Sequence, residues 1–321
     1  INSSSTLSDE YQLIPADSPL SKPIIFQPRI KGLEYAIYHK DKMFYVVTNE
    51  DHHNFSIKTC HLDSTKKENW ITYIEGQDDI LIEGVDVFND FLVVTQRKDG
   101  LLQLKVINLI KKEDFYIPFN EPSYVVQTSS NLLMNTNQLR FSYNSMVNPG
   151  TIYQYDMNSK TTKTLKEKEI IGGYDQKEYV SERIWAEGRD GTSIPVSLVY
   201  KRGLKKDGSN PTLLYAYGSY GYSIDPTFSS NRLSLLNRGF IFAIAHIRGG
   251  EDLGRNWYED GKLLKKKNTF YDFIDCGKFL ITENYCSSSK LYAAGGSAGG
   301  LLMGAWINMA PELFNGVIAH V

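Results

Sequence analysis

The hydrophobic pattern of the chain changes near Gly172, and this change requires two parts with different folds. Before it, from about residue 35 to residue 165, short runs alternate apolar and polar side chains, which is typical of half-buried strands. After it, near-continuous apolar runs alternate with helical stretches, which indicates a mostly parallel sheet covered on both faces. We therefore predict two regions, residues 1–171 and residues 172–321.

The first region contains an internal repeat. Phe44, Phe91 and Phe141 occupy equivalent places in three similar strand–loop–strand units. Their spacing of about 45–50 residues is that of four-stranded propeller blades. A single blade cannot bury both of its faces, so several blades must stack around a common axis. The sequence therefore predicts part of a β-propeller with about three blades, and an open β-sandwich is the alternative.

The second region begins with a hairpin and continues as alternating strands and helices. The turn Asp190-Gly191 joins two strands at residues 182–186 and 194–199, and Pro195 suggests that the second strand lies at a sheet edge. Helices are expected at about residues 232–237, at 270–282 and from 299 onward. Further buried strands are expected at residues 212–217, 240–245, 291–294 and 317–321.

Residues 295–300 (GGSAGG) contain the pattern G-x-S-x-G directly between a predicted strand and a predicted helix. In this context a serine nucleophile lies on a sharp turn, where bulky flanking side chains would collide. Residues 295, 296, 298, 299 and 300 are all small, and the amino terminus of the following helix adds partial positive charge. We therefore predict that Ser297 is a nucleophile. A phosphate-binding glycine turn is the alternative, but the lysine and spacing of a P-loop are absent from this segment.

A serine nucleophile needs a base for its proton and donors for the oxyanion. The backbone N–H of Ala298, directly after the serine, is the natural first donor. In α/β hydrolases an acid and then a histidine follow the serine in chain order. Only His320 follows Ser297, in a predicted strand where packing explains it better than catalysis, and His246 precedes the serine. We therefore expect the triad Asp and His to lie beyond Val321 and the chain alone to be inactive.

The composition argues against several other classes of protein. A net charge of −2, with 41% hydrophobic and 22% charged residues, gives no reason to expect nucleic acid or a membrane as partner. The run Lys265-Lys266-Lys267 is better explained as a solvated helix face than as a phosphate site. No apolar run approaches the ~20 residues that a membrane span needs. The three cysteines lack the spacing of metal ligands or of a disulfide framework, and we predict no metal and no cofactor.

Five segments together resemble peptidases of the prolyl oligopeptidase family, in the same order and at similar spacing. They are residues 214–221 (LYAYGSYG), 246–251 (HIRGGE), 257–262 (WYEDGK), 267–270 (KNTF) and 295–300 (GGSAGG). Residues 219–221, residues 257–261 and Ala298 resemble the oligopeptidase B branch more than the proline-specific one. The resemblance implies the N-terminal part of an α/β-hydrolase domain, preceded by part of a propeller that admits only short peptides. It also implies a cytoplasmic protein.

The same resemblance implies roles for further residues. Tyr217 matches the family tyrosine whose hydroxyl is the second oxyanion donor, and a tyrosine packed at a strand end is the alternative. Asp225 stands where the oligopeptidase B branch has an acid that favours basic residues in the substrate, while Thr227 replaces a second acid. Arg248 and Glu251 are interpreted as an ion-paired scaffold of the site. The carboxylates of the main specificity pocket are expected beyond the end of this chain.

The leading hypothesis is a serine oligopeptidase that cleaves short peptides after Arg or Lys by acyl transfer to Ser297. Its expected partners are short peptides and the C-terminal part of the same protein. An acylaminoacyl peptidase or esterase of the same fold is one alternative, because the G-x-S-x-G turn does not select amides over esters. A catalytically inactive propeller–hydrolase scaffold that binds other proteins is the second alternative.

Overall fold

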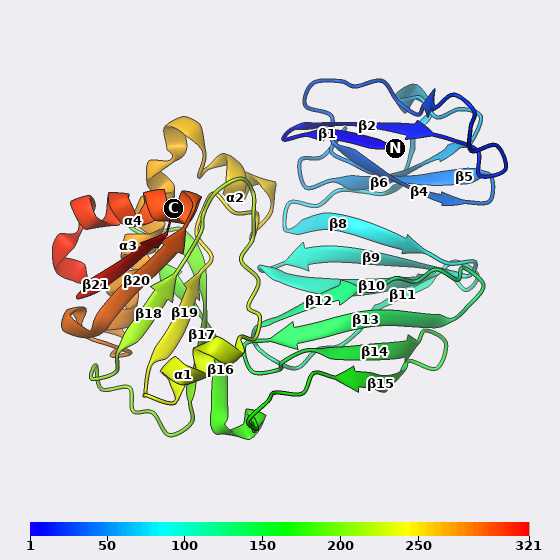
Figure 1. Cartoon of the computed structure of the whole chain (residues 1–321). Coiled ribbons are helices and arrows are strands. Elements are labelled where there is room, and N and C mark those ends of the chain that lie inside the picture. Colours follow the sequence, from blue (N-terminus) through cyan, green and yellow to red (C-terminus); the bar gives the residue numbers. More distant parts are fainter. Residues whose placement is uncertain (321) are drawn as a thin grey trace.

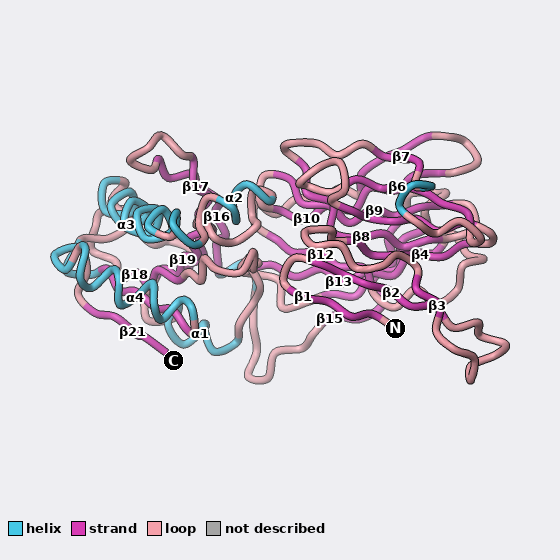
Figure 2. Tube along the Cα trace, turned by 90° about the horizontal axis from the view of Figure 1, so that it is seen from above, coloured by secondary structure: helices cyan, strands magenta, loops and turns pink. Residues whose placement is uncertain are grey.

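The computed structural model describes residues 1–320 (Figure 1). Stacked antiparallel sheets form one side of the molecule, and a sheet flanked by helices forms the other (Figure 1). Seen from above, most helices gather beside the six-stranded sheet, while the other side consists of strands and loops apart from a short helical turn near β6 (Figure 2). None of the described helices combines the length and the apolar character that crossing a bilayer demands.

Three four-stranded antiparallel sheets follow one another along the chain. Phe44, Phe91 and Phe141 are buried, each on the second strand of its sheet. One apolar cluster joins the first sheet to the second, and another joins the second to the third, so the sheets stack as blades. The strands are β4 (Tyr35–Lys40), β5 (Met43–Thr48), β6 (Ser56–His61), β7 (Ile71–Ile74), β8 (Ile80–Val87), β9 (Phe91–Lys98), β10 (Leu101–Asn108), β11 (Glu113–Tyr116), β12 (Tyr124–Thr128), β13 (Gln138–Ser145), β14 (Thr151–Asp156) and β15 (Thr161–Glu167).

A further sheet of three strands precedes the blades and has no counterpart among the predicted elements. Residues Tyr11 and Leu13 of this sheet pack on the buried side chains of Phe26, Tyr35 and Trp70, which joins the sheet to the first blade. The first strand is polar and exposed throughout, so the alternation that marks the other strands is missing there. The strands are β1 (Asn2–Ser5), β2 (Ser8–Leu13) and β3 (Ile24–Ile25).

The second region forms one six-stranded sheet in the order β16-β17-β19-β18-β20-β21. The first two pairs in this order are antiparallel and the other three are parallel, so the sheet is mostly parallel. The predicted fold class is thereby confirmed. The strands are β16 (Tyr179–Glu187), β17 (Ser193–Lys201), β18 (Thr212–Tyr215), β19 (Ile241–Ala245), β20 (Leu291–Gly296) and β21 (Gly316–His320).

Helices cover both faces of the six-stranded sheet. On one face, Phe273 and Trp306 meet edge to face within a core that includes Leu198. On the other face, Leu236 packs in a cluster with Val199, and since neighbouring side chains of a strand point to opposite faces, the helices are on opposite sides. The helices are α1 (Ser230–Leu236), α2 (Arg255–Glu259), α3 (Lys267–Thr282) and α4 (Ala298–Met309), with single 3₁₀ turns η1 (Lys67–Asn69), η2 (Gln176–Glu178), η3 (Leu263–Lys265), η4 (Ser288–Lys290) and η5 (Pro311–Leu313).

The expectation that Pro195 marks an edge strand is wrong, because β17 lies between β16 and β19. Pairing between β17 and β19 starts only at Val196, one residue after the proline. Just after the end of β19, the N–H of His246 donates to the carbonyl of Pro195 at 2.9 Å. The carbonyl of His246 accepts the indole N–H of Trp257 at 3.1 Å, which replaces the donor that a proline lacks.

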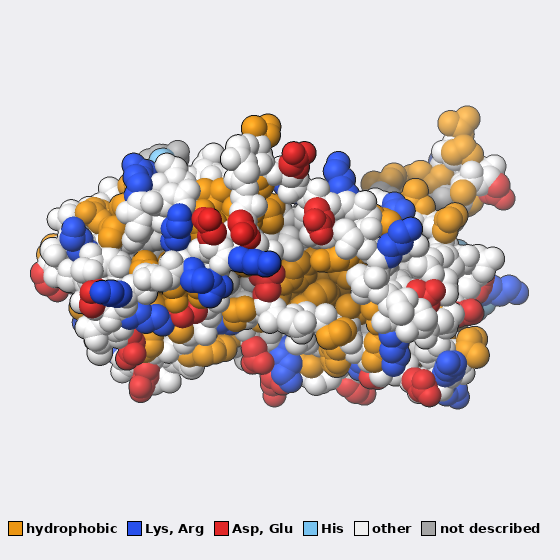
Figure 3. Space-filling model, turned by 90° about the horizontal axis from the view of Figure 1, so that it is seen from below, with side chains coloured by type: hydrophobic (Ala, Val, Ile, Leu, Met, Phe, Trp, Pro, Cys, Tyr) orange, Lys and Arg blue, Asp and Glu red, His pale blue; other side chains and the backbone are white. Residues whose placement is uncertain are grey.

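The face of the molecule seen from below carries charged side chains of both signs (Figure 3). Lys and Arg side chains are interspersed with Asp and Glu, and apolar side chains gather near the middle of this face (Figure 3). Nucleic-acid-binding proteins instead concentrate basic side chains in one patch or stripe. In the described part of the chain, this face shows no such concentration.

Candidate active site

Ser297 lies at the turn between β20 and α4, where it has a φ of 54° and a ψ of −119°. A positive φ is uncommon for any residue other than glycine and stores backbone strain. The turn is tied at both ends, since the N–H of Ser297 donates to the carbonyl of His320 at 3.0 Å and the N–H of Gly300 donates to the carbonyl of Ser297 at 2.8 Å. The serine itself is exposed. This is the geometry that a nucleophile elbow requires.

The glycines around Ser297 are required by close backbone contacts. A Cβ atom at Gly295 would lie 2.4 Å from the carbonyl oxygen of Gly299, and one at Gly300 would lie 2.5 Å from that of His320. A Cβ atom at Gly299 would lie 2.9 Å from the carbonyl oxygen of Ala216. At position 296 the nearest heavy atom would be 3.6 Å away, which is an ordinary contact. The predicted need for small residues therefore holds at 295, 299 and 300, but position 296 has room for an alanine.

Both predicted oxyanion donors, Ala298 and Tyr217, lie at this turn. Ala298 is the first residue of α4, where backbone N–H groups have no acceptor within the helix. Tyr217 follows β18, and its Cα and Cδ2 atoms lie 3.6 and 3.8 Å from the Cβ position of Gly299, the residue after Ala298. The ring of Tyr217 also packs edge to face with that of Tyr222, at 5.8 Å between centroids. The structure thus brings Tyr217, Ala298 and Ser297 together, and their catalytic roles stay predictions.

Arg248 and Glu251 are both ion-paired, but not with each other. Nε of Arg248 lies 2.9 Å from Asp272, and Nη1 lies 2.8 Å from Asp190. Glu251 pairs with Arg255 at 2.9 Å. Burial raises the pKa of the Glu251 carboxyl above its ordinary value, although Arg255 acts in the opposite direction. Both residues therefore hold the loop after β19, each through its own partner.

Glu251 belongs to a network that reaches the first blade. Its partner Arg255 also pairs with Glu34, at 2.9 Å, just before β4. The backbone N–H of Arg255 donates to Oδ1 of Asn54 at 2.7 Å, and Asn54 lies in the loop between β5 and β6. A Cβ atom at Gly254 would lie 2.8 Å from that same oxygen, so the contact is close. The blades and the hydrolase region are therefore joined by polar contacts at this point.

Asp225 forms a second link between the two regions. Its Oδ1 lies 2.8 Å from Nη1 of Arg97 on β9, and Nε of Arg97 lies 2.7 Å from Glu83 on β8. Arg97 is only 4% exposed, so two carboxylates share one buried guanidinium. Burial raises the pKa of Glu83, while Arg97 lowers it. The predicted substrate-binding residue is thus already paired with the propeller side of the molecule.

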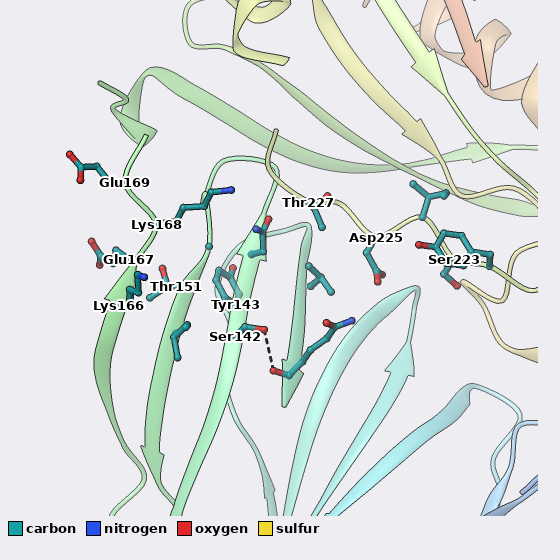
Figure 4. A pocket seen from close by; sticks show the side chains of 17 residues that line it. Ser142, Tyr143, Thr151, Lys166, Glu167, Lys168, Glu169, Ser223, Asp225 and Thr227 are labelled. Atoms are coloured by element: carbon teal, nitrogen blue, oxygen red, sulfur yellow. Dashed lines mark hydrogen bonds between the residues drawn. The ribbon is translucent and has the colours of Figure 1, made fainter. Parts of the chain in front are cut away.

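Asp225 lines two cavities at the junction of the two regions. The larger, of about 1030 Å³, lies between β12–β15 and the loop 222–227, and the side chains of Ser142 and Asp225 are among those that line it (Figure 4). The smaller, of about 510 Å³, is lined by β2, the first two blades, Gln127 of β12, the loop 221–225 and Glu251. Among the residues that line them, neither Ser297 nor Tyr217 is present, but Tyr222 lines both cavities and contacts Tyr217.

A buried network of polar side chains around His246 is not predicted by any sequence pattern. Nδ1 of His246 lies 3.0 Å from Oδ1 of Asp252, and Nε2 lies 2.8 Å from the hydroxyl of Ser197. Ser123, just before β12, donates to Ser197 at 2.9 Å. Ser197, His246 and Asp252 are 0%, 1% and 3% exposed, so a substrate has no access to them. They have the residue types of a catalytic triad, but they act as a link between the blades and the sheet.

We expect His246 to make stability depend on pH. Burial lowers the pKa of this histidine below its ordinary value near 6.5, although Asp252 raises it. The unfolded chain therefore binds more protons below pH 6.5, so stability is fully present above that pH and falls as the pH drops through this window. The slope for one proton is about 1.4 kcal/mol per pH unit. Urea unfolding of the purified protein at pH 7, 6 and 5 should show a weaker loss in His246→Gln.

The exposed His39 offers the matched control, since His39→Gln should reproduce the pH dependence of the unchanged protein. Parallel stability curves for the unchanged protein and His246→Gln would contradict a neutral buried His246. The experiment compares slopes, so a lower absolute stability of the variant does not affect its outcome.

Within the described residues, one group of side chains is close enough to hold a metal ion: His52, His53 and Asp78. Nε2 of His52 and Nε2 of His53 lie 3.3 and 3.9 Å from Oδ1 of Asp78. Nδ1 of His52 accepts the N–H of Asn54 at 3.1 Å, so this nitrogen is already engaged within its own loop. The two rings stack at 4.5 Å between centroids, with 23° between their planes. Ring stacking and the bond from Asn54 therefore account for the placement of His52.

The prediction that Lys265–Lys267 form a solvated face is wrong for the middle lysine. Lys266 is half-buried, and its ammonium donates to the carbonyl of Gly218 and to the hydroxyl of Ser219. A run of three lysines carries no signal of this, because the acceptors are more than forty residues away along the chain. Lys265 pairs with Asp260 at the surface and follows the prediction.

A strained serine between β20 and α4, on a mostly parallel sheet joined to stacked blades, defines an α/β hydrolase with an adjoining β-propeller. Comparison with protein families agrees. The profile of the prolyl oligopeptidase N-terminal β-propeller domain matches residues 1–168, and that of the prolyl oligopeptidase family matches residues 226–321. The chain therefore belongs to the prolyl oligopeptidase family.

Individual relatives point to one branch of this family. Dipeptidyl aminopeptidase BI of Pseudoxanthomonas mexicana is 43% identical over 100% of this chain and 44% of its own length. Protease 2 of Moraxella lacunata is 37% identical over 100% of this chain and 46% of its own. The solved structure of oligopeptidase B from Leishmania major matches 98% of this chain and 46% of its own, with a TM-score of 0.91 and 34% identity. The chain thus spans less than half the length of each, and the predicted resemblance to oligopeptidase B is confirmed.

Proposed function

We propose that this chain is part of a serine oligopeptidase that hydrolyses short peptides after Arg or Lys, with Ser297 as the nucleophile. The observation that carries the proposal is the positive φ of Ser297 on the turn between β20 and α4, next to Tyr217. The longer protein that we propose contains this chain is called the complete enzyme below. Its activity, substrates and partners all belong to the proposal.

The proposed reaction is acyl transfer in two steps. The hydroxyl of Ser297 attacks the peptide carbonyl and passes its proton through a base to the leaving amine, and water then releases the acyl group. The backbone N–H of Ala298 and the hydroxyl of Tyr217 hold the oxyanion that forms at each step. His246 is sealed from solvent and bonded to Ser197 and Asp252, so it does not fit the role of base. We propose that the base and its acid come from the C-terminal part of the complete enzyme.

The charge of the smaller cavity supports a preference for basic peptides. Its lining carries five carboxyl groups and one guanidinium, which belong to Asp9, Glu34, Glu83, Asp225 and Glu251 and to Arg97. Arg255, which does not line the cavity, pairs with two of the five. A cavity lined mainly by one sign of charge attracts ligands of the opposite sign. Asp225 alone is a weaker argument, because Arg97 already balances it.

The named relatives differ in what their names say they release. One is a dipeptidyl aminopeptidase and another is called Protease 2, so the chain's own parent could act on free peptide amino termini or within short peptides. We favour cleavage within short peptides, because the matched solved structure is an oligopeptidase B. The distinction depends on a substrate's amino terminus, which an experiment can vary.

The test compares three fluorogenic substrates with the complete enzyme. These are an N-blocked Arg-Arg amide, the same dipeptide amide with a free amino terminus, and an uncharged acyl ester. We expect kcat/KM to be highest for the N-blocked amide, with the ester lower by at least about tenfold, since a hydrogen bond to a charged group contributes about 1.5–3 kcal/mol. Preference for the free amino terminus would replace the oligopeptidase proposal by a dipeptidyl peptidase. Hydrolysis of the ester with no hydrolysis of either amide would contradict a peptidase and favour the esterase alternative.

A further inference from the structure

Lys266 lies immediately before α3 and is partly withdrawn from water. Its ammonium donates to the hydroxyl of Ser219 at 2.7 Å and to the carbonyl of Gly218. Within residues 1–320 this ammonium forms no salt bridge, and burial lowers the pKa of Lys266 to about 8. A charge removed from water without an opposite charge is costly, so hydrogen bonds from the charged group must offset that cost. The two acceptors are therefore the partners that keep Lys266 in place.

Both acceptors belong to the short loop that begins with Tyr217. Gly218 has a φ of 65°, and a Cβ atom there would lie 2.5 Å from Cγ2 of Thr269 on α3. A Cβ atom at Gly249 would lie 2.1 Å from the carbonyl oxygen of Gly218. That oxygen is thus enclosed between the loop after β19 and the start of α3, where Lys266 is its donor. This carbonyl belongs to the peptide group between Gly218 and Ser219, so Lys266 holds the loop within two residues of Tyr217.

We propose that Lys266 is a positioning residue for the oxyanion-donating hydroxyl of Tyr217, acting through the Gly218 carbonyl and the Ser219 hydroxyl. This inference rests on the proposed function, because it assumes that the Tyr217 hydroxyl meets the oxyanion. An oxyanion donor must be held before the reaction starts, since reorientation during the reaction lowers its effect. A lysine that fixes the backbone next to the donor supplies that constraint.

The test is a double-mutant cycle in the complete enzyme. We expect Lys266→Met to lower kcat about tenfold and to change KM less than about twofold, because misplaced catalytic groups lose rate rather than substrate affinity. In a Tyr217→Phe background, Lys266→Met should cost less than about twofold, since the hydroxyl that it positions is gone. Lys266→Arg keeps the charge and the donors and should recover most of the loss.

The neighbouring Lys267 provides the matched control, because it is exposed and lies on the same helix end. Lys267→Met should match the unchanged enzyme. If Lys266→Met does not fold, Ser219→Ala removes one acceptor more mildly and should lower kcat about two- to threefold, again only when Tyr217 is present. An equal loss from either variant in the Tyr217→Phe background would overturn the proposal, because it would indicate general destabilisation.

The outcomes also separate this inference from the proposed function. Suppose that the complete enzyme cleaves the Arg-Arg amide through Ser297, but that the effects of Lys266→Met and Tyr217→Phe on kcat are additive. The proposed function then stands, and the positioning role of Lys266 is contradicted. If the complete enzyme has no Ser297-dependent peptidase activity, both the proposed function and the role of Lys266 are contradicted. Unchanged kcat in Lys266→Met, with the protein folded, overturns the positioning role directly.

Discussion

Replacement of Ser297 by alanine is expected to lower kcat of the complete enzyme on the Arg-Arg amide by on the order of 10⁶-fold, as loss of a catalytic serine does in other serine hydrolases. Alanine retains a Cβ atom, so it tolerates the φ of 54° no better and no worse than serine. The fold should therefore be unchanged. The measurement is steady-state hydrolysis, together with mass spectrometry of the protein after treatment with a fluorophosphonate probe, which should place the adduct on Ser297.

Ser289 is an exposed serine of the same region, and Ser289→Ala should behave like the unchanged enzyme. Retained hydrolysis in Ser297→Ala, or an unchanged yield of adduct at another serine, would show that the turn is not the nucleophile elbow. Labelling of the 321-residue chain on its own tests where the base lies. Modification of Ser297 there would contradict the expectation that the base lies beyond Val321, whereas its absence in folded chain would support it.

Tyr217→Phe is expected to lower kcat of the complete enzyme by about 10²–10³-fold, which is the usual effect of removing one oxyanion donor. KM should change little, because the hydroxyl meets the oxyanion and not the ground-state carbonyl. The substitution leaves the ring in place, so the contacts of Tyr217 with Tyr222 and with the turn at Gly299 are retained. The measurement is kcat and KM on the same amide, with unfolding curves to show that stability is unchanged.

Tyr220 lies in the same loop and is 73% exposed, so Tyr220→Phe is the matched control and should change kcat less than about twofold. A loss of less than about threefold in Tyr217→Phe would contradict its role as donor. The tyrosine would then be what the alternative reading of the sequence holds, a side chain packed at the end of β18. Ala298 would in that case remain the only predicted donor among the described residues.

The main architecture could be predicted because it depends on local patterns. The period-two runs around Phe44, Phe91 and Phe141 are repeated closely enough to reveal the blades. The first sheet was missed because Asn2–Ser5 is exposed on both faces and carries no such period. The position of Pro195 was misjudged because an inner strand tolerates proline at a point where pairing with its neighbour has not yet begun. Pro195 precedes the start of pairing with β19, and the indole N–H of Trp257 donates to the facing carbonyl of His246.

The site was predicted as far as a contiguous motif reaches. Residues 295–300 predict the turn, since its close backbone contacts require glycine at 295, 299 and 300 around the serine. The partners of Asp225 and Arg248 were not foreseeable, because Arg97 and Asp272 are distant in the sequence. The partner of Glu251 is local, since Arg255 follows it by four residues. Arg248 and Glu251 are both ion-paired, as predicted, and the network of Glu251 continues through Arg255 to Glu34 beside the first blade.

By itself, the sequence determined the two kinds of architecture, the sharp turn at Ser297 and the family, because each depends on local periodicity or on a run of adjacent residues. Only the tertiary structure decided that His246 joins Ser197 and Asp252 out of reach of solvent, and that Lys266 holds the loop of Tyr217. These contacts depend on burial and on segments distant in the chain. Burial changes what a side chain can do, since a histidine or a lysine removed from water must find a partner or give up its charge.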